Sequence, residues 1–99
     1  MAVAVIEITT FRLAPHAEEH AFLDADRRVQ TEVVPNHPGF LRRTTARGDD
    51  GAWLVVVLWR SADEADASRR VAEDHPVTRE FTEFLDATSI RTARYSTLD

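Results

Sequence analysis

The chain has no cysteine, so disulfides, thiol nucleophiles, cysteine-ligated zinc sites and iron–sulfur clusters are excluded. Lysine is also absent and every basic residue is an arginine, which excludes Schiff-base chemistry and a P-loop lysine that binds phosphate. Glycine occurs only at positions 39, 48 and 51, and these glycines form no dinucleotide-binding fingerprint. We therefore expect no nicotinamide or flavin site of the Rossmann kind, and no resident cofactor.

Charge and hydropathy disfavour two further classes of partner. The net charge of -5 at pH 7 argues against nucleic acid, because binding to phosphates needs a basic face. No apolar run approaches the roughly 20 residues that span a bilayer, so no membrane association is expected. The start of the chain, MAVAVIEITT, has neither the basic region nor the cleavage site of a signal peptide. The expectation is a cytoplasmic protein with a single domain, residues 1–99.

Strand and helix signals alternate along the chain. Segments 2–13, 40–47, 52–59 and 88–98 are predicted strands. A first helix is predicted from Pro15 to about residue 34, and its apolar side chains recur at steps of three to five residues. A second helix is predicted from the capping box Ser61-Ala62-Asp63-Glu64, with a packed face that includes Val71. It is interrupted at residues 75–76, and the piece that follows contributes Phe81 and Phe84 to the core.

The resulting order is β-α-β-β-α-β. Since crossovers between parallel strands are right-handed, this order predicts an α+β, ferredoxin-like split βαβ sandwich. Four antiparallel strands would form one sheet, with both helices on one face and with strands 2–13 and 52–59 in the centre.

The central strands are apolar on both faces. Trp53, Val55, Val57 and Trp59 alternate with Leu54, Val56 and Leu58, although helices on one face can cover only one of these rows. An uncovered row would leave several hundred Å² of apolar surface, which soluble monomers rarely expose. We therefore expect a homodimer in which a second copy packs on the sheet face.

The element order, the turn PNHPGF at 35–40 and the joint LWRS at 58–61 resemble those of the antibiotic biosynthesis monooxygenase (ABM) domain family. That family belongs to the dimeric α/β-barrel superfamily, and the resemblance covers nearly the whole chain. It implies a homodimer with a pocket between sheet and helices in each subunit. Members include cofactor-free oxygenases of polycyclic phenols, haem-degrading enzymes, quinol oxygenases and polyketide cyclases. The asparagine and tryptophan of the haem-degrading members have no counterparts here, because the first strand carries Glu7 and residues 62–74 contain no tryptophan. The histidine His75 lies at the break of the second helix, so haem degradation is not expected.

Three residues are candidates for proton transfer. Glu7 lies in a central strand between two isoleucines, where an apolar pocket would raise the pKa of the carboxyl and make it a general base. The alternative is an ion pair with an arginine of the second or the last strand, such as Arg43 or Arg91. His75 is a candidate acid or base, or the N-cap of the next helical piece. Tyr95 on the last strand is a candidate hydrogen-bond donor to a substrate oxygen.

Other side chains are candidates for binding the substrate. Trp53 and Trp59 lie on the same face of their strand, where they either hold a flat aromatic ligand or anchor the core. His37 in the turn, Arg43 and Arg91 are candidates for polar contacts. His16 and His20 are one helical turn apart, but no third ligand accompanies them, so no metal site is expected.

Two functions remain open at this stage. The first is a cofactor-independent monooxygenase of a small phenol- or quinol-like metabolite. The second is a non-catalytic dimer of the same fold that binds a small hydrophobic ligand. Sequence alone does not separate them, since a fold does not imply a function.

Overall fold

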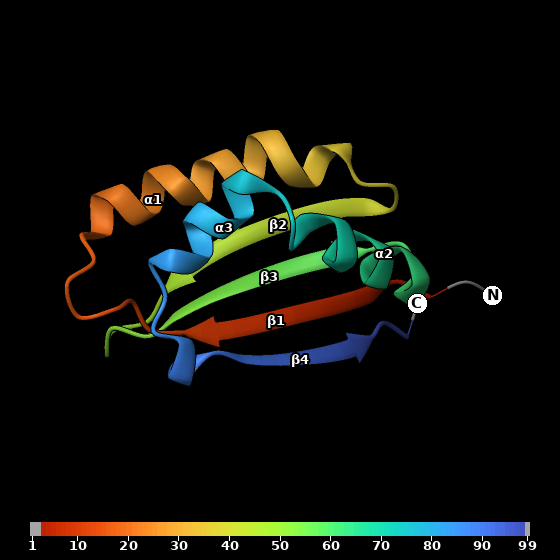
Figure 1. Ribbon diagram of the computed structural model, residues 1–99. Helices are drawn as coiled ribbons and strands as arrows, with labels where there is room; N and C mark the ends of the chain where they lie inside the picture. Colours follow the sequence, from red (N-terminus) through yellow and green to blue (C-terminus); the bar gives the residue numbers. More distant parts are fainter. Residues whose placement is uncertain (1–2, 99) are drawn as a thin grey trace.

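The computed structural model describes residues 3–98, and its helices and strands follow the predicted order (Figure 1). Residues 1, 2 and 99 belong to the expected domain, and residue 2 to the first expected strand, but they lie outside the described residues. The strands are β1 (Val5–Phe11), β2 (Phe40–Arg47), β3 (Trp53–Trp59) and β4 (Arg91–Ser96). The helices are α1 (Glu19–Arg28), α2 (Ala62–Ala72) and α3 (Pro76–Glu83), with a π-helical turn η1 (Val29–Val33) and 3₁₀ turns η2 (Val34–Asn36) and η3 (Ala87–Ser89).

The four strands form one sheet in the order β2-β3-β1-β4, and each neighbouring pair is antiparallel. β1 and β3 are central, as the sequence predicts. Side chains that oppose each other across an antiparallel pair lie on the same face of the sheet. The register therefore places Glu7 of β1 on one face with Val57 of β3 and Arg94 of β4. The ferredoxin-like α+β fold is confirmed.

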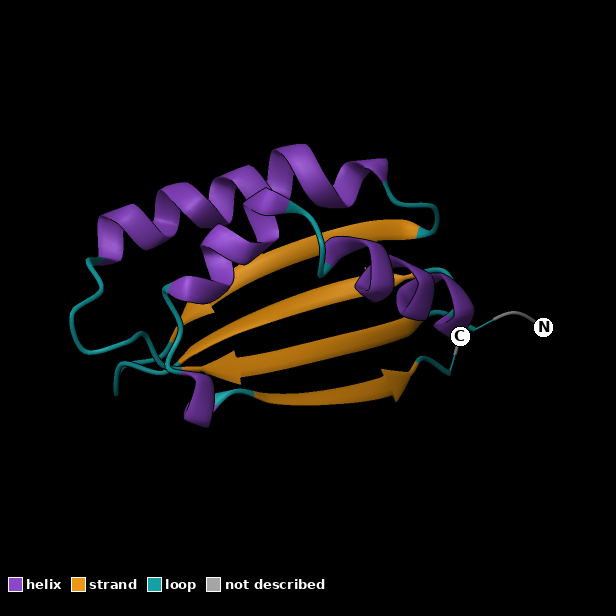
Figure 2. Ribbon diagram, in the orientation of Figure 1, coloured by secondary structure: helices purple, strands orange, loops and turns teal. Residues whose placement is uncertain are grey.

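The three α-helices lie on one face of the sheet (Figure 2). The best-buried side chain is that of Phe22 on α1, which is 0% exposed and packs edge-on against Trp53 of β3, with ring centroids 4.9 Å apart. Phe11 of β1, Phe81 of α3 and Phe84 at the end of α3 belong to the same aromatic cluster. Each such side chain contributes roughly 1.5–3 kcal/mol by leaving water, so α1 and α3 are held to the sheet mainly here.

The opposite face of the sheet is apolar and carries no helix. Leu54, Val56 and Leu58 of β3 alternate with the helix-facing residues, and they pair with Thr10, Ile8 and Ile6 of β1 on the same open face. The isoleucines and these β3 residues are only half-buried. No helix or strand within residues 3–98 covers them (Figure 1). The predicted two-sided pattern of the central strands is therefore present, and its second side is open.

Local signals in the sequence fix the entry to two helices. Ser61 caps α2, since its Oγ accepts from the Glu64 backbone N–H at 3.2 Å while its hydroxyl donates to Glu64 Oε1 at 3.0 Å. His75 caps α3, because its Nδ1 accepts from the Val77 N–H at 3.1 Å. Gly39 has φ +85°, and a Cβ there would lie 2.5 Å from the Glu64 side chain, so the turn before β2 requires glycine.

Two local predictions are wrong. The first helix begins at Glu19 rather than at Pro15, because residues 14–17 form a turn in which the Ala14 N–H donates to the Phe84 carbonyl at the end of α3. Val71 was expected on the packed face of the second helix, but it is 60% exposed. The helix turns only Ala65 and Ser68 fully toward the interior.

Candidate functional site

A pocket of about 480 Å³ lies between the helix-covered face of the sheet and the helices α2 and α3. We call it the Glu7 pocket. Its walls combine aliphatic side chains with hydroxyl groups and one ion pair. The lining residues are Glu7, Thr9, Val34, Val57, Trp59, Ala65, Ser68, Arg69, Ala72, Thr78 and Thr92. A mostly apolar cavity with a few convergent polar groups is the usual form of a small-molecule site.

Glu7 is the centre of an ion-pair cluster in this pocket. Its Oε2 accepts from Arg69 Nη2 at 2.7 Å and from Arg94 Nη2 at 2.8 Å and Nε at 3.1 Å. Arg94 also donates to Asp66 Oδ1 at 2.7 Å. The hydrogen bonds with Asp66 and Glu7 raise the pKa of Arg94, and the hydrogen bond from Arg94 lowers the pKa of Asp66. The side chain of Glu7 is only 12% exposed.

This cluster corrects the expected surroundings of Glu7. The apolar pocket on which the general-base prediction depended is replaced by two guanidinium groups. The ion-pair alternative is confirmed, and the last strand supplies one partner as expected, but that arginine is Arg94 rather than Arg91, and the second partner, Arg69, comes from α2. Arg43 is buried and pairs with Asp26 of α1 at 2.8 Å. It is not next to Glu7 in the sheet, because β3 lies between β2, which carries Arg43, and β1, which carries Glu7. Arg91 pairs in register with Thr10, so it lies on the open face of the sheet and not beside Glu7.

One carboxylate oxygen of Glu7 has no hydrogen-bond partner among the described residues. Both arginines contact Oε2, and within the described residues no hydrogen bond reaches Oε1. Two more polar atoms that belong to lining residues, Trp59 Nε1 and Thr78 Oγ1, are buried without a hydrogen-bond partner in that same range. Buried polar groups are usually paired in native proteins, so the hydrogen-bonding capacity of this wall is not fully used.

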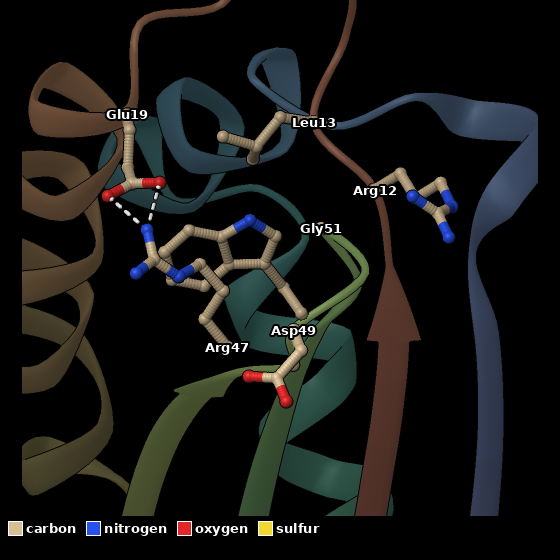
Figure 3. Close-up of a pocket in the computed structure, with 8 residues that line it drawn as sticks. Arg12, Leu13, Glu19, Arg47, Asp49 and Gly51 are labelled. Carbon is tan, nitrogen blue, oxygen red and sulfur yellow. Dashed lines mark hydrogen bonds and ion pairs between the residues drawn. The ribbon is translucent and has the colours of Figure 1, made fainter.

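The two tryptophans do not enclose one ligand. They share a face of β3, as predicted, but six residues of strand separate them by roughly 20 Å. Trp59 lines the Glu7 pocket, whereas Trp53 lines a different one at the other end of the sheet, about 540 Å³ in volume, which we call the Arg47 pocket. In that pocket Arg47 points toward Glu19 and donates to both of its carboxylate oxygens at 2.7 Å (Figure 3). Trp53 therefore acts as a core residue beneath this ion pair.

His37 and His75 lie outside the Glu7 pocket. The Nδ1 of His37 forms a short hydrogen bond with Ser68 Oγ. His37 also lines a separate pocket of about 220 Å³, the His37 pocket, together with Asn36, Pro38, Glu64, Ala67, Ser68 and Val71. Burial, with a smaller effect of His75, lowers the pKa of His37. His75 uses its Nδ1 as the α3 cap, which is the structural alternative that the sequence left open.

Tyr95 is not near the pocket either. It pairs in register with Ile6, which places it on the open face of the sheet, and it is 56% exposed. Odd and even positions of a strand face opposite sides, so Arg94 enters the Glu7 pocket region while its neighbour cannot. Of the eight predicted site residues, the structure brings only Glu7 and Trp59 to one pocket.

The histidines of the first helical turn form no metal site. His20 Nε2 lies 3.4 Å from Glu18 Oε2, and both side chains are largely exposed. Among residues 3–98, no three histidine, aspartate or glutamate side chains are placed to hold a metal ion. Within the same range no helix has the length and hydropathy to cross a membrane.

Sequence reasoning predicted only Glu7 and Trp59 among the lining residues, and it missed three polar residues on the helix side of the pocket. Arg69 and Ser68 lie on α2, and Thr78 lies on α3. A weak signal existed for Ser68, which interrupts the apolar face formed by Ala65 and Ala72 with a hydroxyl. Arg69 gave none, because an arginine in an amphipathic helix is normally a solvated side chain.

Comparison with known proteins gives the fold a context. The sequence matches no protein-family model, and it has no significant match among curated proteins. Several solved structures match over nearly their whole length. A variant of SnoaB from Streptomyces nogalater, described as a cofactor-independent oxygenase, has a TM-score of 0.79 at 15% identity and covers 97% of this chain and 94% of its own.

Two further structures agree with it. A Bordetella bronchiseptica protein, described as a candidate antibiotic biosynthesis monooxygenase, has a TM-score of 0.81 at 15% identity and covers 98% of this chain and 99% of its own. Rv0793 from Mycobacterium tuberculosis has a TM-score of 0.72 at 17% identity and covers 97% and 96%. These likenesses confirm the resemblance at the level of architecture. The chain has the fold of the antibiotic biosynthesis monooxygenase domain family.

Proposed function

We propose that the Glu7 pocket binds a small hydroxylated aromatic molecule and that the protein oxidises it with dioxygen, without a cofactor. One observation carries the proposal: a carboxylate with one unpaired oxygen and a guanidinium group share a pocket wall with aliphatic side chains and an indole ring. The oxygenase described for the similar SnoaB structure supports the reaction type. The pocket volume of about 480 Å³ is within the range of small-molecule sites.

The ligand hydroxyl would lie against Glu7 and Arg69. Glu7 Oε1 accepts its proton, and the Arg69 guanidinium stabilises the phenolate that forms, since a fixed cation next to a developing oxyanion lowers its energy. The Trp59 ring supplies a flat apolar surface for the aromatic ring. An electron-rich phenolate is the form of the ligand that reacts most readily with oxygen.

The reaction balances without a further reductant. A phenol with a free ring position and one O₂ give a quinone and one water. The O–H bond and one ring C–H bond break, the O–O bond breaks, and a new C=O bond forms at that carbon. The ligand supplies all four electrons that reduce O₂, and it releases two protons, the same number that the water takes up.

The proposal also includes what covers the open face of the sheet. Ile6, Ile8, Leu54, Val56 and Leu58 form a contiguous apolar surface with no covering element within residues 3–98. We propose that a second copy of the chain packs on this face. The Glu7 pocket lies on the helix side, so the dimer would support the sheet that forms its floor.

Oxygen uptake tests the proposed oxidation. The purified protein is given a panel of phenols and hydroquinones in an oxygen-electrode cell, with Glu7→Gln as the test variant. We expect uptake with at least one compound and a loss of 10²-fold or more, on the order expected for removal of a general base. Glu19→Gln is the matched control, since Glu19 is an ion-paired carboxylate of the Arg47 pocket.

The same panel separates the two candidate functions. Saturable binding without oxygen uptake would contradict catalysis and leave the ligand-binding function. Uptake that persists unchanged in Glu7→Gln would contradict the role of Glu7.

A further inference from the structure

Ser68 is the one described residue that lines both the Glu7 pocket and the His37 pocket. It lies on α2 directly before Arg69 and is only 7% exposed. A serine side chain is short, so its hydroxyl is the group that it can present to either pocket. Ser68 therefore forms part of the wall between a ligand site and the outer surface of the molecule.

The hydroxyl of Ser68 is hydrogen-bonded on the outer side. Its partner is Nδ1 of His37, which belongs to the turn between η2 and β2. When that nitrogen carries no proton, the Ser68 hydroxyl donates to it, and the lone pairs of the serine oxygen remain free to accept from a ligand. When the nitrogen is protonated, it donates to Ser68 Oγ, and the hydroxyl can then donate into the Glu7 pocket.

We propose that Ser68 and His37 form a proton relay through which a hydroxylated ligand in the Glu7 pocket exchanges protons with the outer surface. The inference rests on the proposed ligand-binding function of that pocket. Within the relay Ser68 touches the ligand, whereas His37 acts through Ser68 and holds the proton.

The surroundings of His37 favour the neutral imidazole. Burial lowers its pKa, and the nearby His75 lowers it further. The groups that face His37 are Ser68 and Glu64 from α2 and His75 from the start of α3. His75 cannot replace Ser68 as a partner through its Nδ1, because that atom accepts from Val77. A neutral imidazole is ready to receive a proton at neutral pH.

The relay gives the pocket a second proton-transfer group on the wall opposite the sheet. The proposed oxidation removes two protons from the ligand, one from its hydroxyl and one from a ring carbon. Glu7 is placed for one of these transfers, but its side chain is nearly enclosed and its Oε2 is held by Arg69 and Arg94. Ser68 and His37 provide a path to the surface for the other proton.

The test uses a ligand whose ionisation is visible and needs no turnover. We would bind 4-nitrophenol to the full chain and follow the imidazole signals of His37 by NMR against pH, with 4-nitroanisole as the ligand that has no hydroxyl. In the relay the phenol donates its proton to Ser68 Oγ while the Ser68 proton passes to Nδ1 of His37. The phenolate then accepts from Ser68, Ser68 accepts from Nδ1–H, and the anion favours the doubly protonated imidazole. We expect 4-nitrophenol to raise the pKa of His37 by about one, and 4-nitroanisole to leave it in place.

Variants at Ser68 distinguish a relay from simple charge attraction. Ser68→Thr keeps the hydroxyl and should keep the response, whereas Ser68→Ala should abolish it. If Ser68→Ala does not fold, His37→Asn replaces it, since the asparagine amide can still bond to Ser68 but does not titrate. The fraction of bound 4-nitrophenol that is ionised near neutral pH, read from its absorbance, should then fall several-fold. His20→Asn, an exposed histidine on α1, is the control.

The outcomes separate the relay from the oxidation. An equal response in Ser68→Ala, no response in the native protein, or no binding of either ligand would overturn the relay. A His37 response without oxygen uptake on the phenol panel would overturn only the oxidation. Oxygen uptake that is insensitive to Ser68→Ala, with no His37 response, would overturn only the relay.

Discussion

Glu7 on β1 and Arg94 on β4 lie directly opposite each other in the sheet, and Arg94 donates two hydrogen bonds to a single carboxylate oxygen of Glu7. Arg69 reaches the same oxygen from α2. Glu7 therefore links its central strand to the edge strand through Arg94 and to α2 through Arg69, at the wall of the Glu7 pocket. Its position makes it both a structural link and the polar centre of the candidate site.

We expect this link to contribute to stability. Glu7→Gln and Arg94→Gln should each lower the free energy of unfolding by about 1–3 kcal/mol, because each removes one charged partner from a partly buried ion-pair cluster. The double variant should lose less than the sum of the two, by at least about 0.5 kcal/mol. Urea denaturation measures all three. Arg12→Gln is the control, since Arg12 and Asp50 form an exposed pair worth about 0–1 kcal/mol; additive losses would contradict the coupling.

The aromatic cluster should depend on Phe22. Phe22→Ala removes a completely buried ring between α1 and the sheet, and we expect a loss of about 3–5 kcal/mol in the free energy of unfolding. The neighbouring Leu23 is 37% exposed, so Leu23→Ala should cost much less, under about 1 kcal/mol. Thermal or urea unfolding compares the two, and equal losses would show that the core is not centred on Phe22.

His37 should make stability depend on pH. Its pKa in the folded chain is lowered from the ordinary value of 6.5, mainly by burial, so the unfolded chain binds more protons in the range between the two values. The free energy of unfolding therefore rises with pH through this range. The contribution of neutral His37 is fully present above about pH 6.5 and is lost as the pH falls through the pKa of the folded chain.

The corresponding variant isolates this effect. In His37→Asn the urea midpoint should vary less between pH 7 and pH 5 than in the native protein. His20→Asn, with an exposed imidazole, should keep the native slope. An unchanged slope in His37→Asn would mean that other groups cause the dependence.

The open sheet face should carry the dimer contact. Two copies of 11.2 kDa should sediment together at low micromolar concentration. Val56→Asp places a charge in the centre of the apolar face and should yield monomers, because burying an unpaired carboxylate is costly. Thr31→Asp, on the solvent side of η1, should leave the dimer intact. Circular dichroism checks that each variant folds, and a native protein that sediments as a folded monomer would contradict the proposed interface.

Much of the fold follows from local patterns in the sequence. Apolar spacing located the strands and the core contacts of Phe81 and Phe84. The Ser61 capping box marked the start of α2, and the break at residues 75–76 marked the start of α3. Such signals act over a few residues, so they can be read along the chain. The start of the first helix was misplaced because the turn before it begins at Ala14, whose backbone N–H donates to the carbonyl of Phe84, seventy residues away.

The sequence predicted the residues of the candidate site much less well than it predicted the fold. Glu7 was singled out because a carboxylate in a central strand needs a partner or a function. An arginine of the last strand was among the expected partners, but the sequence did not identify it as Arg94, and it gave no sign of Arg69. Arg43 was a plausible partner by residue type and was excluded only by strand order, since β3 separates it from β1. Tyr95 was excluded by register, which turns it to the open face.

The sequence by itself determined the element order, the two-sided apolar character of the central strands and the absence of cysteine and lysine chemistry, because composition and periodicity are properties of the chain. Only the tertiary structure decided which polar groups meet. Strand register and the packing of α2 bring Glu7, Ser68, Arg69 and Trp59 to one pocket from distant parts of the sequence. A shift of one residue in the pairing of β4 would turn Arg94 away from Glu7, and no local pattern specifies that choice.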